Sequence, residues 1–176
     1  MRQDNAAEQS FAQAVLPWFQ MAIESDLRLF QPDVQGSNPL NSSPYLVDFA
    51  RFRDAFGRST RRALLVERLQ TMLTELEVSG IEIIALLIGG SMVERSREPR
   101  DIDCAAFYRC SGPAGDVGVR LAGTARQYLA VGVDVRFVPV DSDPLILIKM
   151  TSYFTSLYSA TRDGRERRFG HLLVVP

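Results

Sequence analysis

The sequence predicts a mixed α/β (α+β) domain with one small β-sheet and helices packed on it. Short runs of β-branched and aliphatic residues alternate along the chain with longer segments of helical periodicity. The chain has 176 residues, which fits one domain. Hydrophobic residues make up 46% and charged residues 23%, so the composition is that of an ordinary globular protein.

Composition also excludes several classes of protein. The net charge is −1, which argues against a dedicated nucleic-acid binder without excluding a local basic patch. Two cysteines and one histidine leave too few ligands for a structural zinc site. No apolar run is long enough to cross a membrane, and the polar start of the chain is unlike a signal peptide. We therefore expect a cytoplasmic protein with reduced thiols and no membrane partner.

A linker divides the chain into an extension and a main body. Residues 31–44 are rich in Pro, Ser, Asn and Gly, a composition typical of a loop. We expect an N-terminal helical extension with its linker over 1–44 and the main domain over 45–176. Apolar spacings of three and four predict a helix before the linker, with a turn or kink near Pro17. This helix is too short to fold alone, so it must pack on the body or on a partner.

The main body contains helices and strands in alternation. A short helix is expected over 45–56. The next, over 60–78, has a capping Ser or Thr at its start and Gly80 after its end. The apolar run 81–88 predicts a buried strand. After it come a polar turn or loop over 92–100, a strand over 101–108 and a loop over 111–118. The last elements are a helix over 119–131, a strand over 133–140, a helix over 144–160 and a strand over 171–175. Pro139 places the end of the strand 133–140 at a sheet edge.

Two aspartates on a predicted strand suggest a metal site. Asp101 and Asp103 are two residues apart, so both side chains project from the same face of the strand. Carboxylates this close repel one another, and a hard cation such as Mg²⁺ relieves the repulsion. The alternative is that both aspartates are simply solvated at the end of the strand.

A third aspartate lies on the next predicted strand. Its apolar residues, at 133, 135 and 137, form the buried face, so Asp134 and Arg136 share the opposite face. If the two strands are neighbours, Asp134 completes a cluster of three acids. Otherwise it is an exposed strand residue.

A glycine-rich turn follows the buried strand directly. Gly89, Gly90 and Ser91 allow a phosphate to approach the backbone, and the serine adds a hydroxyl donor. The alternative is an ordinary tight turn, because the segment lacks the lysine of a classical phosphate-binding loop. A phosphate-holding turn beside an acid pair is the arrangement that nucleotidyl transfer requires.

These segments resemble the DNA polymerase β-like nucleotidyltransferase superfamily, in particular its small, minimal members of uncharacterised family. The resemblance is carried by LLIGGSMVERSREPRDIDCAAFY (86–108) and VDVRFV (133–138), and it covers about residues 60–140. A pair of arginines, Arg61 and Arg62, at the start of the preceding helix fits the same small proteins.

The resemblance implies a short mixed sheet with helices on one side. It also implies Mg²⁺, in a two-metal site, and a nucleoside triphosphate, most often ATP, whose NMP group moves to a hydroxyl of a protein, an RNA or a small molecule. Asp101 and Asp103 would bind the metal ions, and Asp134 would complete the second metal position and help to activate the acceptor. The implied nucleotide-binding residues are Gly89, Gly90, Ser91 and Lys149.

The chain lacks the large helical domain with which many polymerases of this superfamily hold the base or the acceptor, so the acceptor stays unspecified. Tyr153 and Tyr158 are candidates for base stacking, although aromatic residues at helical spacing usually belong to a core. The alternative is a non-catalytic or weakly catalytic protein of the same fold, such as an antitoxin-like partner in a two-component system. A pseudoenzyme is the third possibility.

Overall fold

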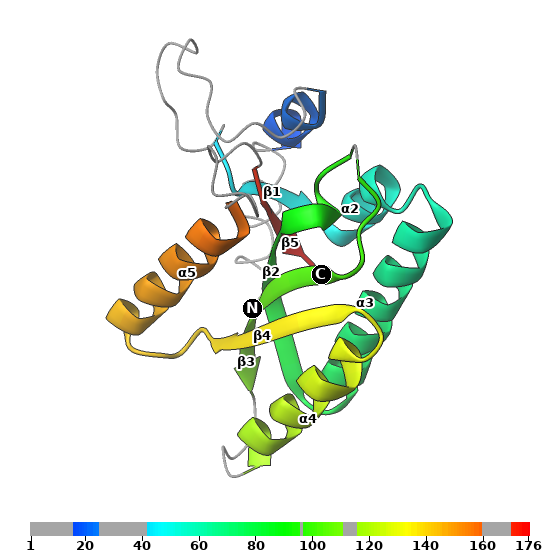
Figure 1. The fold of residues 1–176 in the computed structure, drawn as a ribbon. Helices are drawn as coiled ribbons and strands as arrows, with labels where there is room; N and C mark the ends of the chain where they lie inside the picture. The colour runs from blue at the N-terminus through cyan, green and yellow to red at the C-terminus, as the bar shows by residue number, and fades with distance from the viewer. Residues whose placement is uncertain (1–15, 25–41, 96, 111–115, 160–169) are drawn as a thin grey trace, which may run out of the picture.

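A single five-stranded sheet with the strand order β1-β5-β2-β3-β4 organises the computed structural model of the chain (Figure 1). The structure describes residues 16–24, 42–95, 97–110, 116–159 and 170–176. The strands are β1 (Tyr45–Asp48), β2 (Ile81–Gly89), β3 (Ile102–Cys110), β4 (Val133–Pro139) and β5 (Leu172–Val175). The helices are α2 (Phe49–Phe56), α3 (Thr60–Val78), α4 (Val117–Leu129) and α5 (Pro144–Ser159), with a 3₁₀ turn η2 (Gly90–Met92). The general α+β class is therefore confirmed.

The sheet is mixed. β2 runs antiparallel to both of its neighbours, β3 and β5. The two outer pairs, β3 with β4 and β1 with β5, are parallel. β4 lies at one edge, as Pro139 predicted, because proline cannot donate to a further strand.

One face of the sheet carries the main core. Alternate residues of the central strands, such as Leu86, Ile88 and Cys104, point to this face and are fully buried. Helix α3 covers them with an apolar stripe that includes Leu65 and Leu69. α2 and α4 add further apolar side chains to the same core.

Helix α5 covers the other face. Leu87, Ala105 and Val138 point to this side and form a second cluster with Phe154 and Tyr158 of α5. The implied arrangement with helices on one side of the sheet is thus wrong for this chain. The reason is that α5 follows the edge strand β4 after a short turn and is apolar enough to fold back over the opposite face (Figure 1).

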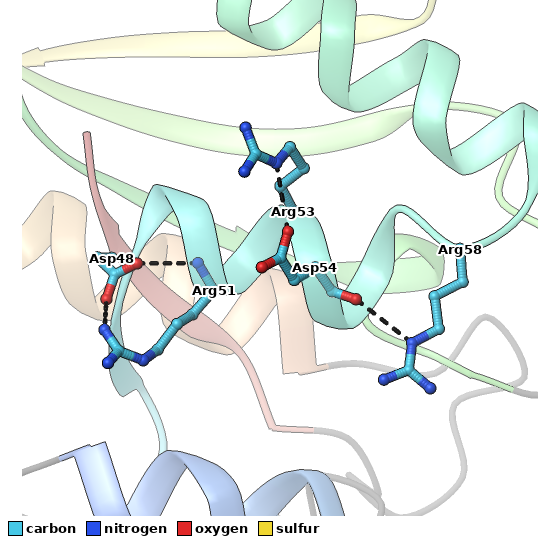
Figure 2. A network of polar contacts seen from close by, with 5 residues as sticks. All are labelled: Asp48, Arg51, Arg53, Asp54 and Arg58. Carbon is cyan, nitrogen blue, oxygen red and sulfur yellow. Dashed lines mark hydrogen bonds and ion pairs between the residues drawn. The ribbon is translucent and has the colours of Figure 1, made fainter.

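The helix predicted over 45–56 divides into two elements. Tyr45–Asp48 is strand β1, with Tyr45 and Val47 buried, and only Phe49–Phe56 is helical. Asp48 ends the strand and caps α2, because its Oδ1 accepts a hydrogen bond of 2.8 Å from the backbone N–H of Arg51 (Figure 2). Residues 45–48 are extended because they pair with β5, which lies far away in the sequence. The other helices and strands predicted for the main body agree with the structure to within a few residues. Most of the loop predicted over 111–118 lies outside the described residues.

The N-terminal extension packs on the main body. Residues 16–24 are helical, and Phe19 and Ala22 are buried within the main core. The side chain of Arg95 donates a hydrogen bond of 3.2 Å to the carbonyl of Ile23 from the loop after η2. The rest of the predicted extension and linker, 1–15 and 25–41, lies outside the described residues, so the proposed boundary at residue 44 stays a prediction. None of the described helices is long and apolar enough to span a membrane.

The only histidine of the chain is buried where three elements meet. His171 is 1% exposed, just before β5. Its Nδ1 lies 3.1 Å from the hydroxyl of Ser43, which precedes β1, and 3.2 Å from that of Ser159, at the end of α5. Burial lowers the pKa of His171 to about 4. The ring is therefore neutral in the folded protein at neutral pH.

We expect acid to destabilise the fold through this histidine. Below pH 6.5 the unfolded chain binds a proton at His171 that the folded protein does not bind until about pH 4. The free energy of unfolding should therefore fall with decreasing pH across this window, with a limiting slope of about 1.4 kcal/mol per pH unit. Urea unfolding of the wild type and of His171→Gln at several pH values measures the difference. Parallel pH profiles for the two proteins would contradict this assignment.

Candidate functional site

Three of the predicted site residues form a row across three neighbouring strands. Gly89, the last residue of β2, pairs with Asp103 of β3, and Asp103 pairs with Asp134 of β4. Adjacent strands are about 4.8 Å apart, and residues paired in a ladder project from the same face. The two carboxylates therefore stand side by side on the face that α5 covers, next to the end of β2.

The two glycines of the turn allow close contacts with other parts of the molecule. Gly90 has a φ of +62°, and a Cβ built on it would lie 2.9 Å from Oδ2 of Asp103. A Cβ on Gly89 would lie 2.5 Å from the Cβ of Tyr158 in α5. The carboxylate of Asp103 thus lies against the backbone of the turn, in a place that only glycine leaves open.

Asp134 forms an ion pair on its own strand. Nη1 of Arg136 lies 2.5 Å from Oδ1 of Asp134, and Nη2 lies 3.4 Å from Oδ2. The guanidinium balances one of the two neighbouring negative charges. A cation that uses Asp134 as a ligand has to share that carboxylate with Arg136 or displace the guanidinium.

The acids also affect groups beneath them. Burial raises the pKa of the Tyr158 hydroxyl, and the negative charges of Asp103 and Asp134 raise it further. Burial raises the pKa of the Cys104 thiol in the same way, with smaller contributions from both aspartates. Both groups are therefore protonated and neutral, which makes them poor nucleophiles.

Asp101 lies just outside the row. It precedes the first residue of β3 and is partly buried. The backbone is held on both sides of it, since Arg61 donates to the carbonyl of Arg100 and the N–H of Ile102 donates to the carbonyl of Gly132 over 2.9 Å. In the described part of the chain, no three His, Cys, Asp or Glu side chains are grouped as metal ligands. The structure thus brings together two of the three predicted acids.

The other predicted nucleotide-binding residues lie in different surroundings. Ser91 is partly exposed in η2, directly after Gly90. Lys149 is exposed on α5, and from residue 149 to residue 158 the helix rises about 13 Å. Lys149 is therefore far along the helix from the part that packs on Gly89, and its contact with a triphosphate stays a prediction. Tyr153 is 56% exposed, whereas Tyr158 belongs to the second core cluster.

Sequence reasoning gave no role to Arg62, which the structure shows to hold the backbone next to the candidate site. Its side chain is buried, and its guanidinium donates to backbone carbonyls of the segment that joins the Gly-Ser turn to β3. Its position in the sequence could have indicated a buried role. Arg62 falls on the apolar stripe of α3, three residues before Leu65 and seven before Leu69. A charged residue on such a stripe needs buried hydrogen-bond acceptors.

The fold and site define a mixed α+β protein with a pair of carboxylates beside a Gly-Ser turn. Residues 30–173 match the model of a family described as "Family of unknown function (DUF6932)", and the chain belongs to this family. No curated protein matches the chain, and no solved structure matches it.

We expect an alanine at Gly90 to disturb Asp103 as well as the turn. Gly80→Ala is the matched control, because Gly80 also has a positive φ, +79°, but nothing lies within 4 Å of its Cβ position. Each substitution should cost about 1–2 kcal/mol through backbone strain. Gly90→Ala should in addition shift the side-chain carboxyl signal of Asp103 in an NMR spectrum, and Gly80→Ala should not. Equal effects of the two variants on this signal would contradict the contact.

Proposed function

We propose that the protein is a Mg²⁺-dependent nucleotidyltransferase that moves an NMP group, AMP from ATP in the first instance, to a hydroxyl of a protein, RNA or small-molecule acceptor. The observation that carries the proposal is the register of the sheet. It sets Asp103 beside Asp134 and against the backbone of Gly90. An acid pair thus adjoins a Gly-Ser turn, which we propose to hold the phosphates.

The donor set fits Mg²⁺. This ion is commonly bound by one or two carboxylates together with phosphate oxygens of the substrate, and Asp103 with Asp134 offers two neighbouring carboxylates. Asp101, partly exposed just before β3, is the residue that would add a third. When bound, the ion would neutralise the triphosphate and acidify the acceptor hydroxyl.

The remaining roles belong to groups of the chain itself. The backbone of Gly90 and the hydroxyl of Ser91 would hold the phosphates of the donor nucleotide. Asp134 would accept the proton of the acceptor hydroxyl, which attacks the α-phosphate as pyrophosphate leaves. Arg136, 56% exposed, is free enough to turn from Asp134 toward a phosphate when a cation takes its place.

The Asp103→Asn variant tests this proposal. It keeps the size of the side chain and removes the charge, so Mg²⁺-dependent ATP binding should weaken by at least about tenfold. Asp116→Asn is the matched control, because Asp116 makes no side-chain capping contact and the change in charge is the same. Calorimetry with ATP, in the presence and absence of Mg²⁺, measures the affinity of both variants, and Asp116→Asn should bind like the wild type. Full metal-dependent binding by Asp103→Asn would overturn the assignment.

A binding protein of the same fold is the second candidate, and helix α5 favours it. Leu145, Ile146, Ile148 and Tyr153 are each more than half exposed, although the opposite side of the helix already packs on the sheet. Apolar side chains gathered on one surface are typical of interaction sites.

This second candidate predicts a stable complex with a protein encoded beside it and no Mg²⁺-dependent nucleotide binding. Ile148→Glu should abolish the complex without unfolding the chain, because the side chain is 63% exposed. Size-exclusion chromatography of the co-expressed pair measures this. Gln70→Glu is the control, because Gln70 is exposed on α3, which covers the other face of the sheet, and the complex should tolerate the new charge there. A complex that tolerates Ile148→Glu would exclude α5 as the contact surface.

A further inference from the structure

One buried arginine donates hydrogen bonds to backbone carbonyls on either side of residue 96, in the segment between the Gly-Ser turn and β3. Arg62 is 7% exposed. Its Nη2 donates to the carbonyls of Glu94 and Arg97, each over 2.6 Å, and lies 3.5 Å from that of Ser91. Its Nη1 donates to the carbonyl of Met92. A single side chain thus gathers carbonyls from both ends of the segment.

These contacts explain how a charged group can be buried there. Burial lowers the pKa of Arg62, and the nearby charges of Glu98 and Glu94 act in the opposite direction. A guanidinium has five N–H donors in a rigid fork, and it stays charged. A cluster of inward carbonyls supplies the acceptors that the donors need, so the segment and the arginine stabilise one another.

The inward carbonyls also fix which way other backbone groups point. Across a trans peptide bond, the carbonyl of one residue and the N–H of the next point in opposite directions. Because the carbonyls of Ser91 and Glu94 turn toward Arg62, the N–H groups of Met92 and Arg95 turn away from it. The N–H of Val93, which follows the inward carbonyl of Met92, donates to the carbonyl of Gly90 over 3.3 Å and so closes the turn. A backbone turn fixed in this way is the kind of structure whose other N–H groups can form an anion-binding nest.

Two neighbours of Arg62 secure the far end of the same segment. Ser59, which caps α3, donates from its hydroxyl to Oε1 of Glu98 over 2.5 Å. Arg61 donates to the carbonyl of Arg100, next to Asp101. Residues at the start of α3 therefore fix where the Gly-Ser turn lies relative to Asp101 and Asp103, which follow it in the chain.

We propose that Arg62 is a positioning residue for nucleotide binding: it holds the Gly90–Met92 turn in the shape that receives the phosphates, at a fixed place relative to Asp103. This inference rests on the proposed nucleotidyltransferase function, and Arg62 itself need not touch the nucleotide.

Hydrogen exchange tests the positioning role without any nucleotide. In Arg62→Met, the amide of Val93, which donates to the carbonyl of Gly90, should exchange at least about tenfold faster, while amides of β2 and β3 keep their protection. Arg62→Lys should fall between this variant and the wild type, since lysine retains the charge but not the fork. Arg68→Met is the matched control, because Arg68 of the same helix donates to the carbonyl of Val131 in another loop. Wild-type protection of the Val93 amide in Arg62→Met, or faster exchange throughout the chain, would overturn the proposal.

Nucleotide affinity tests the consequence for the site. Arg62→Met should weaken Mg²⁺-ATP binding by about tenfold and leave adenosine binding unchanged, because only the phosphates use the turn. Arg62→Lys should restore part of the loss, and Arg68→Met should bind like the wild type. Equal losses for ATP and adenosine would mean that Arg62 acts only on folding. If the wild type binds no Mg²⁺-ATP, the nucleotidyltransferase proposal fails, whereas the exchange experiment still decides whether Arg62 holds the turn.

Discussion

The strand register at Asp103 is the constraint on which the rest of the site depends. Pairing with Gly89 on one side and Asp134 on the other fixes both the neighbours of this carboxylate and the face on which it lies. A slip of one residue would send Asp103 into the main core and bring Cys104 to the site. The fully buried residues on either side of Asp103, Ile102 and Cys104, make such a slip costly.

Two arginines near this end of the sheet are held in different ways. Arg136 neutralises Asp134 on the surface, through an ion pair that solvent and salt can weaken. Arg62 lies behind the turn, out of water, and is held by backbone carbonyls. The exposed arginine is therefore able to exchange partners when a cation or phosphate arrives, whereas the buried one is fixed in place.

Buried polar groups also connect distant parts of the chain. His171 joins the start of β1 to the end of α5 through two serine hydroxyls. Arg62 joins the start of α3 to the segment before β3. Both contact groups of other elements and so tie these elements together in a way that apolar packing alone does not. Among the described residues, Nε2 of His171 has no hydrogen-bond partner.

The sequence by itself determined the elements whose signals are local. The apolar periodicity and the caps of α3 are contained within the helix and its neighbours, and its predicted bounds, 60–78, are those observed. Strand β1 could not be predicted in this way, because its four residues become extended only by pairing with β5 at the other end of the chain. Strand order likewise decided that Asp103 and Asp134 are neighbours, and that Asp101, just before β3, stays outside their row. The sequence marked the position of Arg62, but only the tertiary structure showed its role. The carbonyls that accept its hydrogen bonds are about thirty residues away, and a sequence pattern does not show which way a peptide group turns.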